Sequence, residues 1–176
     1  MDSSALMLTT VKPLTSENAI ERTAHFDATG RYRYSLGRQW RRHGPQVTFI
    51  MLNPSQADAE RDDPTLRACL QFAQRWEYAS LAVVNLFAYR TPHPKALVKA
   101  AEPVGAGCDR ALLTAAAAAD RIILAWGNWG KLLDRDRAVL KLLMPHQHKL
   151  YCLGRNQTQQ PRHPLYVKRT TEPIPW

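Results

Sequence analysis

Polar and aromatic side chains gather directly after four short apolar segments of the sequence. Asn53 follows the first segment, Asn85 lies at the end of the second, Trp126 follows the third, and His163 comes shortly after the fourth. An amide both donates and accepts hydrogen bonds, and a histidine ring exchanges a proton near neutral pH. These residue types suit a site that hydrogen-bonds a polar ligand. No Ser/His/Asp order, phosphate-binding loop or GxGxxG segment is present, so a nucleotide cofactor is disfavoured and no cofactor is expected.

The apolar segments are predicted strands that alternate with helices. Strands are expected at 47–52, 80–86, 121–125 and 149–153, and helices from Asp63-Pro64 onward, over 109–118 and over about 131–144. Such alternation implies a mostly parallel sheet covered on both faces, with ligands binding beyond the carboxyl ends of the strands. A turn at 27–30, followed by alternating apolar residues, predicts a hairpin at the edge of the sheet.

The expected architecture is therefore an α/β fold. We predict a three-layer α/β/α arrangement with a mostly parallel four-stranded sheet and an N-terminal β-hairpin extension. The length of 176 residues, without internal repeats or Gly/Ser linkers, is typical of one domain. We expect an N-terminal lead-in over residues 1–20 and a single domain over 21–176.

The charge balance points to a polyanion. Lys and Arg number 24 against 15 Asp and Glu, and most of the basic residues are arginines, whose planar fork suits phosphate. The region 137–171 holds basic residues, Lys168 among them, and no acidic one. A second basic cluster consists of Arg31, Arg33, Arg38, Arg41, Arg42 and His43. The alternative is a basic protein without a special partner.

The number and spacing of cysteines and the length of apolar runs disfavour several other classes of protein. The three cysteines, Cys69, Cys108 and Cys152, stand far apart, which excludes a disulfide scaffold and argues against a cysteine metal site. No apolar run reaches the roughly 18–20 residues of a membrane span, and residues 1–10 lack the basic start of a signal peptide. We expect a cytoplasmic protein without a metal or a membrane partner, and a monomer is favoured.

The segments at the strand ends resemble the uracil-DNA glycosylase superfamily, especially its mismatch-specific thymine/uracil branch. Four motifs appear in order: Leu52-Asn53-Pro54-Ser55, Val84-Asn85-Leu86, a strand ending in Trp126-Gly127, and His163-Pro164-Leu165. More closely, the NPS, DDPT, NLFAYR and PRHPLY segments resemble a bacterial and phage family of uncharacterised proteins, which implies no known activity.

The superfamily resemblance implies a role for each of these residues in breaking an N-glycosidic bond. Asn53 would position the attacking water, because an amide takes up no proton near neutral pH. His163 would donate a hydrogen bond to the departing base, Asn85 would read a pyrimidine edge, and Phe87 would stack on the flipped base. Their structural alternatives are a turn at Asn53-Pro54, a Pro-bounded surface histidine, a loop-pinning amide and a core phenylalanine.

Departures from the superfamily pattern refine the expected substrate. Ser55 stands where uracil-specific members carry a bulky Tyr, so the pocket is expected to admit 5-substituted pyrimidines, including hypermodified phage bases. The tail after Pro164 is short, and either Leu165 or Tyr166 is the expected wedge in the duplex. Asp58 is expected to assist the water or to offset positive charge on the sugar, the alternative being a solvated loop carboxylate.

The function expected from these inferences is a monofunctional DNA glycosylase that flips and excises a pyrimidine. No lysine falls on the motifs at the strand ends to form a Schiff base. The expected phosphate contacts are Arg90, Arg155, Arg162 and Lys168. Alternatives are a non-catalytic reader of modified or damaged DNA, a hydrolase of nucleosides or nucleotides, and a scaffold protein. DNA repair, phage defence and phage counter-defence are all compatible with such a pocket.

Overall fold

Four short runs rich in Val, Ile and Leu form the parallel part of the sheet. They are β4 (Gln46–Met51), β5 (Ser80–Asn85), β6 (Arg121–Leu124) and β7 (Leu150–Cys152). In the computed structural model, which describes residues 7–9 and 20–176, they lie in the order β5-β4-β6-β7 with every neighbouring pair parallel. The four predicted parallel strands are confirmed, and each end lies within one residue of its expected position.

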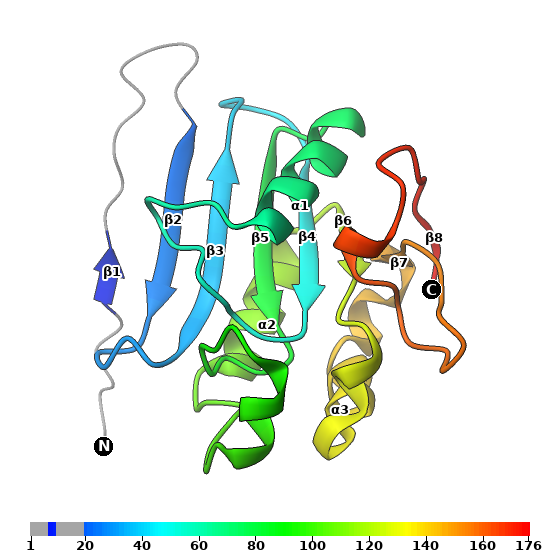
Figure 1. Ribbon diagram of the computed structural model, residues 1–176. Helices are drawn as coiled ribbons and strands as arrows, with labels where there is room; N and C mark the ends of the chain where they lie inside the picture. Colours follow the sequence, from blue (N-terminus) through cyan, green and yellow to red (C-terminus); the bar gives the residue numbers. More distant parts are fainter. Residues whose placement is uncertain (1–6, 10–19) are drawn as a thin grey trace.

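The sheet is larger and more mixed than the sequence indicates. β1 (Met7–Thr9), β2 (Glu21–Phe26) and β3 (Arg33–Gln39) add antiparallel strands beside β5, and β8 (Ile174–Pro175) adds one beside β7. The predicted mostly parallel four-stranded sheet is thus corrected to a mixed eight-stranded sheet (Figure 1). The predicted hairpin is present as β2 and β3, joined by a turn in which Gly30 has φ +68°. The two-residue β8 contains a proline and has no strand signature of its own.

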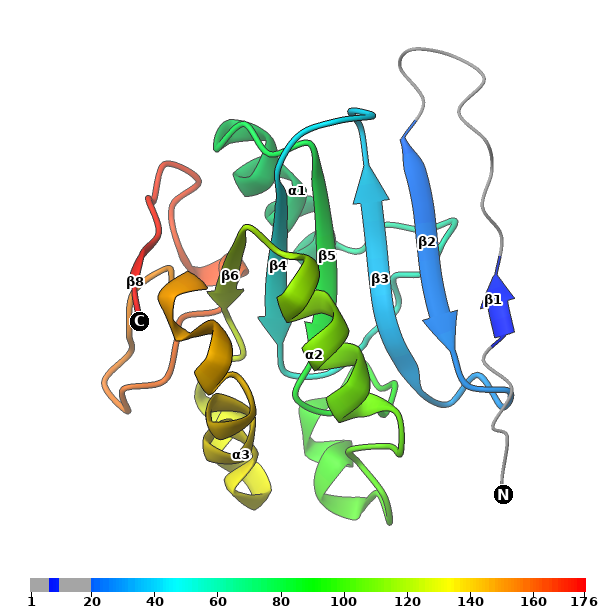
Figure 2. The same cartoon turned by 180° about the vertical axis from the view of Figure 1, so that it is seen from behind.

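Helices cover both faces of the sheet. α1 (Pro64–Arg75) lies on one face, and α2 (Cys108–Ala118) and α3 (Arg135–Leu142) lie on the other (Figures 1 and 2). Each face has its own apolar cluster, one built around Phe49 and Phe72 and the other around Ile50 and Leu112. Because alternate residues of β4 point to opposite faces, a run buried on both sides supplies both clusters.

The predicted third helix begins later than expected. Leu133 and Asp134 have φ values of +56° and +51°, which an α-helix does not admit, so α3 starts at Arg135. Residues before it form the short 3₁₀ helix η2 (Asn128–Asp134). Three further 3₁₀ helices are η1 (Pro94–Lys99), η3 (Met144–Lys149) and η4 (Pro164–Tyr166).

The predicted lead-in over residues 1–20 lies almost entirely outside the described residues, apart from β1 and Ile20. Within residues 7–9 and 20–176, no helix is long and apolar enough to cross a membrane.

Two members of the predicted basic cluster over residues 31–43, Arg33 and Arg38, lie on β3 and are buried. Arg38 is 1% exposed, and its guanidinium bonds to Asp62 Oδ1 through Nε at 3.0 Å and Nη2 at 2.7 Å. Arg22 approaches the same carboxylate at 3.0 Å. Arg33 is 4% exposed as well, so neither Arg33 nor Arg38 forms part of a basic surface.

Removing the Asp62 carboxylate will strongly destabilise the fold. In Asp62→Ala the Arg38 guanidinium, whose side chain is 0% exposed, is left buried without its counter-charge. The expected loss in the free energy of unfolding is about 3–5 kcal/mol, measured by urea denaturation. Glu172→Ala is the control, because it breaks the exposed pair with Arg75 and should cost no more than about 1 kcal/mol. Equal losses in the two variants would contradict this assignment.

Candidate functional site

A cavity of about 570 Å³ lies at the carboxyl ends of the parallel strands. Asn53 follows β4, Asn85 ends β5, Trp126 follows β6, and His163 comes from the segment after β7, and all four line this cavity. The chain leaves β4 toward β5 through α1 and returns past β4 to β6 through α2, so the cavity lies where connections from adjacent strands diverge. Such a switch point is where sheets of this kind bind ligands. The cavity has the size of a small-molecule site.

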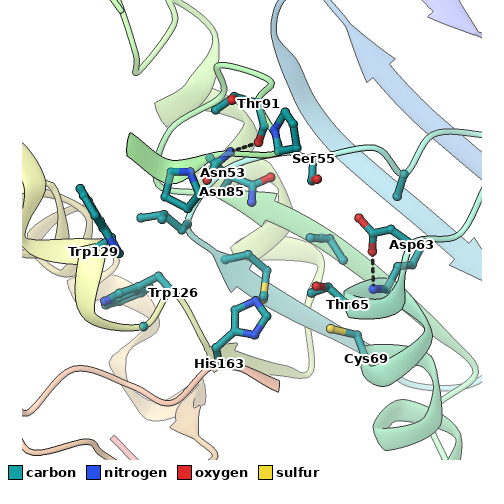
Figure 3. A pocket seen from close by; sticks show the side chains of 18 of the residues that line it. Asn53, Ser55, Asp63, Thr65, Cys69, Asn85, Thr91, Trp126, Trp129 and His163 are labelled. Carbon is teal, nitrogen blue, oxygen red and sulfur yellow. Dashed lines mark hydrogen bonds between the residues drawn. The ribbon is translucent and has the colours of Figure 1, made fainter. Parts of the chain in front are cut away.

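The side chains surround the cavity from three directions (Figure 3). Asn53 and Asn85 lie together at one end, and His163 lies across from them. Asp63 and the α1 residues Thr65 and Cys69 form one flank, while Trp126 and Trp129 form the other, and together they line the cavity. The structure thus brings together the three residues on which the sequence-based hypothesis depends, while their chemical roles stay predictions.

Asn53 is held in one orientation by backbone carbonyls. Its Nδ2 donates to the carbonyl of Thr91 at 2.7 Å and to that of Pro54 at 2.9 Å, and Thr91 N donates back to Pro54 at 2.9 Å. Both amide hydrogens are therefore used, which leaves Oδ1 as the group that faces a ligand. No hydrogen bond to this Oδ1 occurs among the described residues. Asn53 therefore offers the cavity an oriented acceptor.

Asn85 is buried without hydrogen-bond partners. It is 3% exposed, and neither Oδ1 nor Nδ2 has a partner within residues 7–9 and 20–176. Each unsatisfied group of a buried amide lowers the stability of the fold by about 1–3 kcal/mol. Such a group in a native structure therefore calls for an explanation, such as a role in binding. Since the side chain lines the cavity, a ligand with one donor and one acceptor would satisfy it. The loop-pinning alternative needs a hydrogen bond from this amide, and the described part of the chain provides none.

His163 is neutral and has a defined tautomer. Burial lowers its pKa to about 4, although the charge of Asp63 opposes the shift. Nδ1 accepts a hydrogen bond from Leu165 N at 3.3 Å, so the single proton of the neutral ring is on Nε2. The imidazole therefore offers a hydrogen-bond donor from the side that does not contact the backbone.

Asp63 is a site residue that sequence reasoning explained only as a helix cap. The cap is confirmed, because Oδ1 accepts from Leu66 N at 2.8 Å at the start of α1. The carboxylate also lines the cavity, and of the residues 7–9 and 20–176 it is the only carboxylate to do so. A capping residue has one oxygen to spare, so the cap signal was compatible with a second role but did not predict it.

Phe87 does not reach the cavity. It is 0% exposed and belongs to the apolar cluster under α2 and α3, so the expected stacking role is corrected to the core alternative. Other aromatic rings line the cavity: Trp129 is 39% exposed and Tyr166 is 82% exposed. Gly127, with φ +72°, turns the chain after β6 toward this rim.

Asp58 also stands apart from the cavity. Its Oδ1 accepts from Glu60 N at 2.9 Å and Arg61 N at 2.8 Å, which closes a turn of the loop after β4. It is not among the cavity-lining residues, so its expected catalytic role is corrected to a structural one. Arg90 stabilises the same loop, since its Nε donates to Ser55 O at 2.9 Å, and it does not line the cavity either.

The remaining expected residues divide between the cavity and the outer surface. Ser55 lines the cavity, whereas Pro54 is buried beside it. Leu165 is 40% exposed next to the mouth. The three basic residues expected to contact phosphate after β7 are exposed, and only the first of them lines the cavity: Arg162, Arg155 and Lys168.

The cavity offers no reactive thiol. Cys69 lines it, but burial raises the pKa of its thiol far above neutral pH, so this cysteine stays protonated. Among the described residues, no group of three or more His, Cys, Asp or Glu side chains is arranged to hold a metal ion. The polar chemistry available is therefore that of asparagine amides, hydroxyl groups, arginines, one carboxylate and one neutral imidazole.

Comparison with known proteins gives one match. The model of a family described as "Protein of unknown function (DUF1643)" matches residues 33–165. This stretch includes Asn53, Asp63, Asn85 and His163. No curated protein and no solved structure matches the chain. The resemblance to uracil-DNA glycosylases stays a prediction, because none of these findings supports it.

The His163 ring will titrate with a midpoint near 4 in an NMR experiment on its side chain. In the unfolded chain the same ring protonates near 6.5. The unfolded state therefore binds more protons between these values, so this contribution to stability is complete above pH 6.5 and is lost as the pH falls toward 4. Asp63→Asn should lower the midpoint further, because it removes the nearby negative charge. A midpoint close to 6.5 would contradict the assignment of a half-buried ring that is neutral near pH 7.

Proposed function

The chain belongs to the DUF1643 family, and we propose that it is a DNA glycosylase that hydrolyses the N-glycosidic bond of a flipped, 5-substituted pyrimidine. The unpartnered, buried amide of Asn85 carries this proposal. A pyrimidine edge presents a ring N–H or amino donor next to a carbonyl acceptor, which complements an amide. Pairing with such an edge removes the cost of leaving Oδ1 and Nδ2 unsatisfied.

Two of the groups that line the cavity match the two charges that develop as the bond breaks. Positive charge grows on the sugar and negative charge on the base, so a catalyst must stabilise both. Asp63, whose carboxylate lines the cavity, offsets the sugar's charge in place of Asp58. The Nε2–H of His163 donates to an oxygen of the departing base. A neutral imidazole suits this role because its proton is available across the physiological pH range.

The attacking water is positioned by Asn53. Its Oδ1 accepts a hydrogen bond from the water, and the bonds from Nδ2 to Thr91 and Pro54 prevent the amide from turning. The water oxygen bonds to the anomeric carbon as the bond to the base breaks. The bonding electrons leave with the base, which takes up the proton that the water loses. The products are a free base and an abasic sugar, and the step needs no redox or covalent partner.

Substrate class follows from the lining residues. Ser55 leaves room beside the base, which supports 5-substituted pyrimidines over plain uracil. Trp129 and Tyr166 replace Phe87 as stacking surfaces for the flipped base, since both lie exposed at the cavity. Arg155, Arg162 and Lys168 extend basic charge beyond one nucleotide, and this favours DNA over a free nucleoside.

The proposed reaction is tested by base release from duplex and single-stranded oligonucleotides that bear uracil, mismatched thymine or a 5-modified pyrimidine. We expect release of a 5-modified base, more slowly of uracil, and about 100-fold slower release in Asn53→Ala with DNA affinity retained. Gln74→Ala, which removes an exposed amide on α1, is the matched control and should leave the rate unchanged.

The outcomes separate the proposed enzyme from its alternatives. Tight binding of a modified oligonucleotide without alkali-labile abasic sites would instead identify a non-catalytic reader. Faster hydrolysis of free nucleotides than of oligonucleotides would identify a nucleotide hydrolase. Uracil released as fast as every 5-substituted base would contradict the role given to Ser55.

A further inference from the structure

Arg33 brings a buried positive charge to the cavity. It begins β3, is 4% exposed and is among the cavity-lining residues. Burial lowers its pKa to about 10, so the guanidinium remains charged near neutral pH. Its Nη1 donates to the carbonyl of Ala57 at 2.6 Å, which fixes the plane of the group. A buried cation is costly unless something compensates its charge.

The other edge of this guanidinium, formed by Nε and Nη2, lacks a partner. Nε is buried with no hydrogen bond, and Nη2 makes none within residues 7–9 and 20–176. Arg38, five positions along the same strand, provides an internal comparison: its Nε and Nη2 both bond to Asp62 Oδ1. A carboxylate therefore occupies the same edge in Arg38 that has no partner in Arg33.

Neighbouring side chains do not replace that carboxylate. Asp63 and Asp58 attract the Arg33 charge, while Arg90 and Arg38 repel it, and in the described part of the chain Arg33 forms no ion pair. Asp63 uses Oδ1 to cap α1. The two free N–H groups of Arg33 are parallel donors, an arrangement that matches the two oxygens of a carboxylate or phosphate.

We propose that the Nε–Nη2 edge of Arg33 binds an oxyanion of the ligand inside the cavity. This inference deepens the proposed function and rests on it for the identity of the base. The ligand of this cavity is then a pyrimidine nucleotide that presents two anionic oxygens to Arg33. These oxygens belong either to a carboxylate substituent of the base or to the phosphate on its sugar.

Calorimetric titration with three ligands that share one base tests the oxyanion subsite. They are 2'-deoxyuridine, its 5'-monophosphate and 5-carboxy-2'-deoxyuridine. Wild type should bind one of the two anionic ligands at least about tenfold more tightly than the neutral nucleoside, and the preferred ligand identifies the source of the oxyanion. In Arg33→Gln this preference should be lost. Arg33→Lys, which keeps the charge but not the two parallel donors, should retain only part of it.

Two further variants test whether the loss of preference in Arg33→Gln results from misfolding or from the change in net charge. Asp63→Asn keeps the helix cap but removes a competing negative charge, so it should bind the preferred anionic ligand more tightly, which a misfolded protein would not do. Arg110→Gln, an exposed change on α2, loses the same charge and should keep the wild-type preference. Equal affinity for charged and neutral ligands, or a preference that survives in Arg33→Gln, would overturn the proposal.

The binding results differ if the proposed function is wrong and the cavity does not recognise a pyrimidine base. If none of the three ligands binds, recognition of the base is refuted, and inorganic phosphate then becomes the probe of Arg33 alone. Phosphate binding that Arg33→Gln loses and Arg110→Gln keeps supports the oxyanion site without the base. Phosphate binding that is absent, or equal in wild type and Arg33→Gln, refutes it.

Discussion

The parallel register of β4 with its two neighbours is the constraint on which the site depends. Pairing of Gln46 with Ser80 and of Val47 with Arg121 sets where each strand ends, and therefore where the residues that follow it emerge. A slip of two residues would keep every side chain on its face but would move Asn85 relative to Asn53 by about 7 Å. The apolar clusters under both faces oppose such a slip, so the core fixes the polar geometry.

Much of the fold could be predicted because local patterns determine it. Apolar runs located the four parallel strands, and Asp63-Pro64 located the start of α1. The late start of α3 could not be predicted, since it depends on left-handed conformations at Leu133 and Asp134, and leucine rarely adopts this conformation. The mixed edges of the sheet were missed because β8 has only two residues and because β3 pairs with β5, from which β4 and α1 separate it in the chain.

The site shows where sequence reasoning ends. Residues directly after strands were placed correctly, because the carboxyl ends of parallel strands meet in any sheet of this kind. Phe87 and Asp58 were misassigned because direction and burial within a loop depend on tertiary contacts. Asp63 and Arg33 were missed for a related reason. Asp63 is already explained locally as a helix cap. Arg33 belongs to a cluster of basic residues, and no local pattern indicates that part of this cluster is buried.

The central claim is that Asn85 receives its missing hydrogen bonds from a nucleobase. It is tested most directly by the side-chain amide NMR signals of Asn85, identified by their loss in Asn85→Asp. The titrant is an oligonucleotide whose 5-modified pyrimidine carries a 2'-fluoro group that blocks hydrolysis. Our account predicts that the two Nδ2 protons shift and exchange more slowly with solvent when the DNA binds. Saturated binding that leaves these signals unchanged would contradict it.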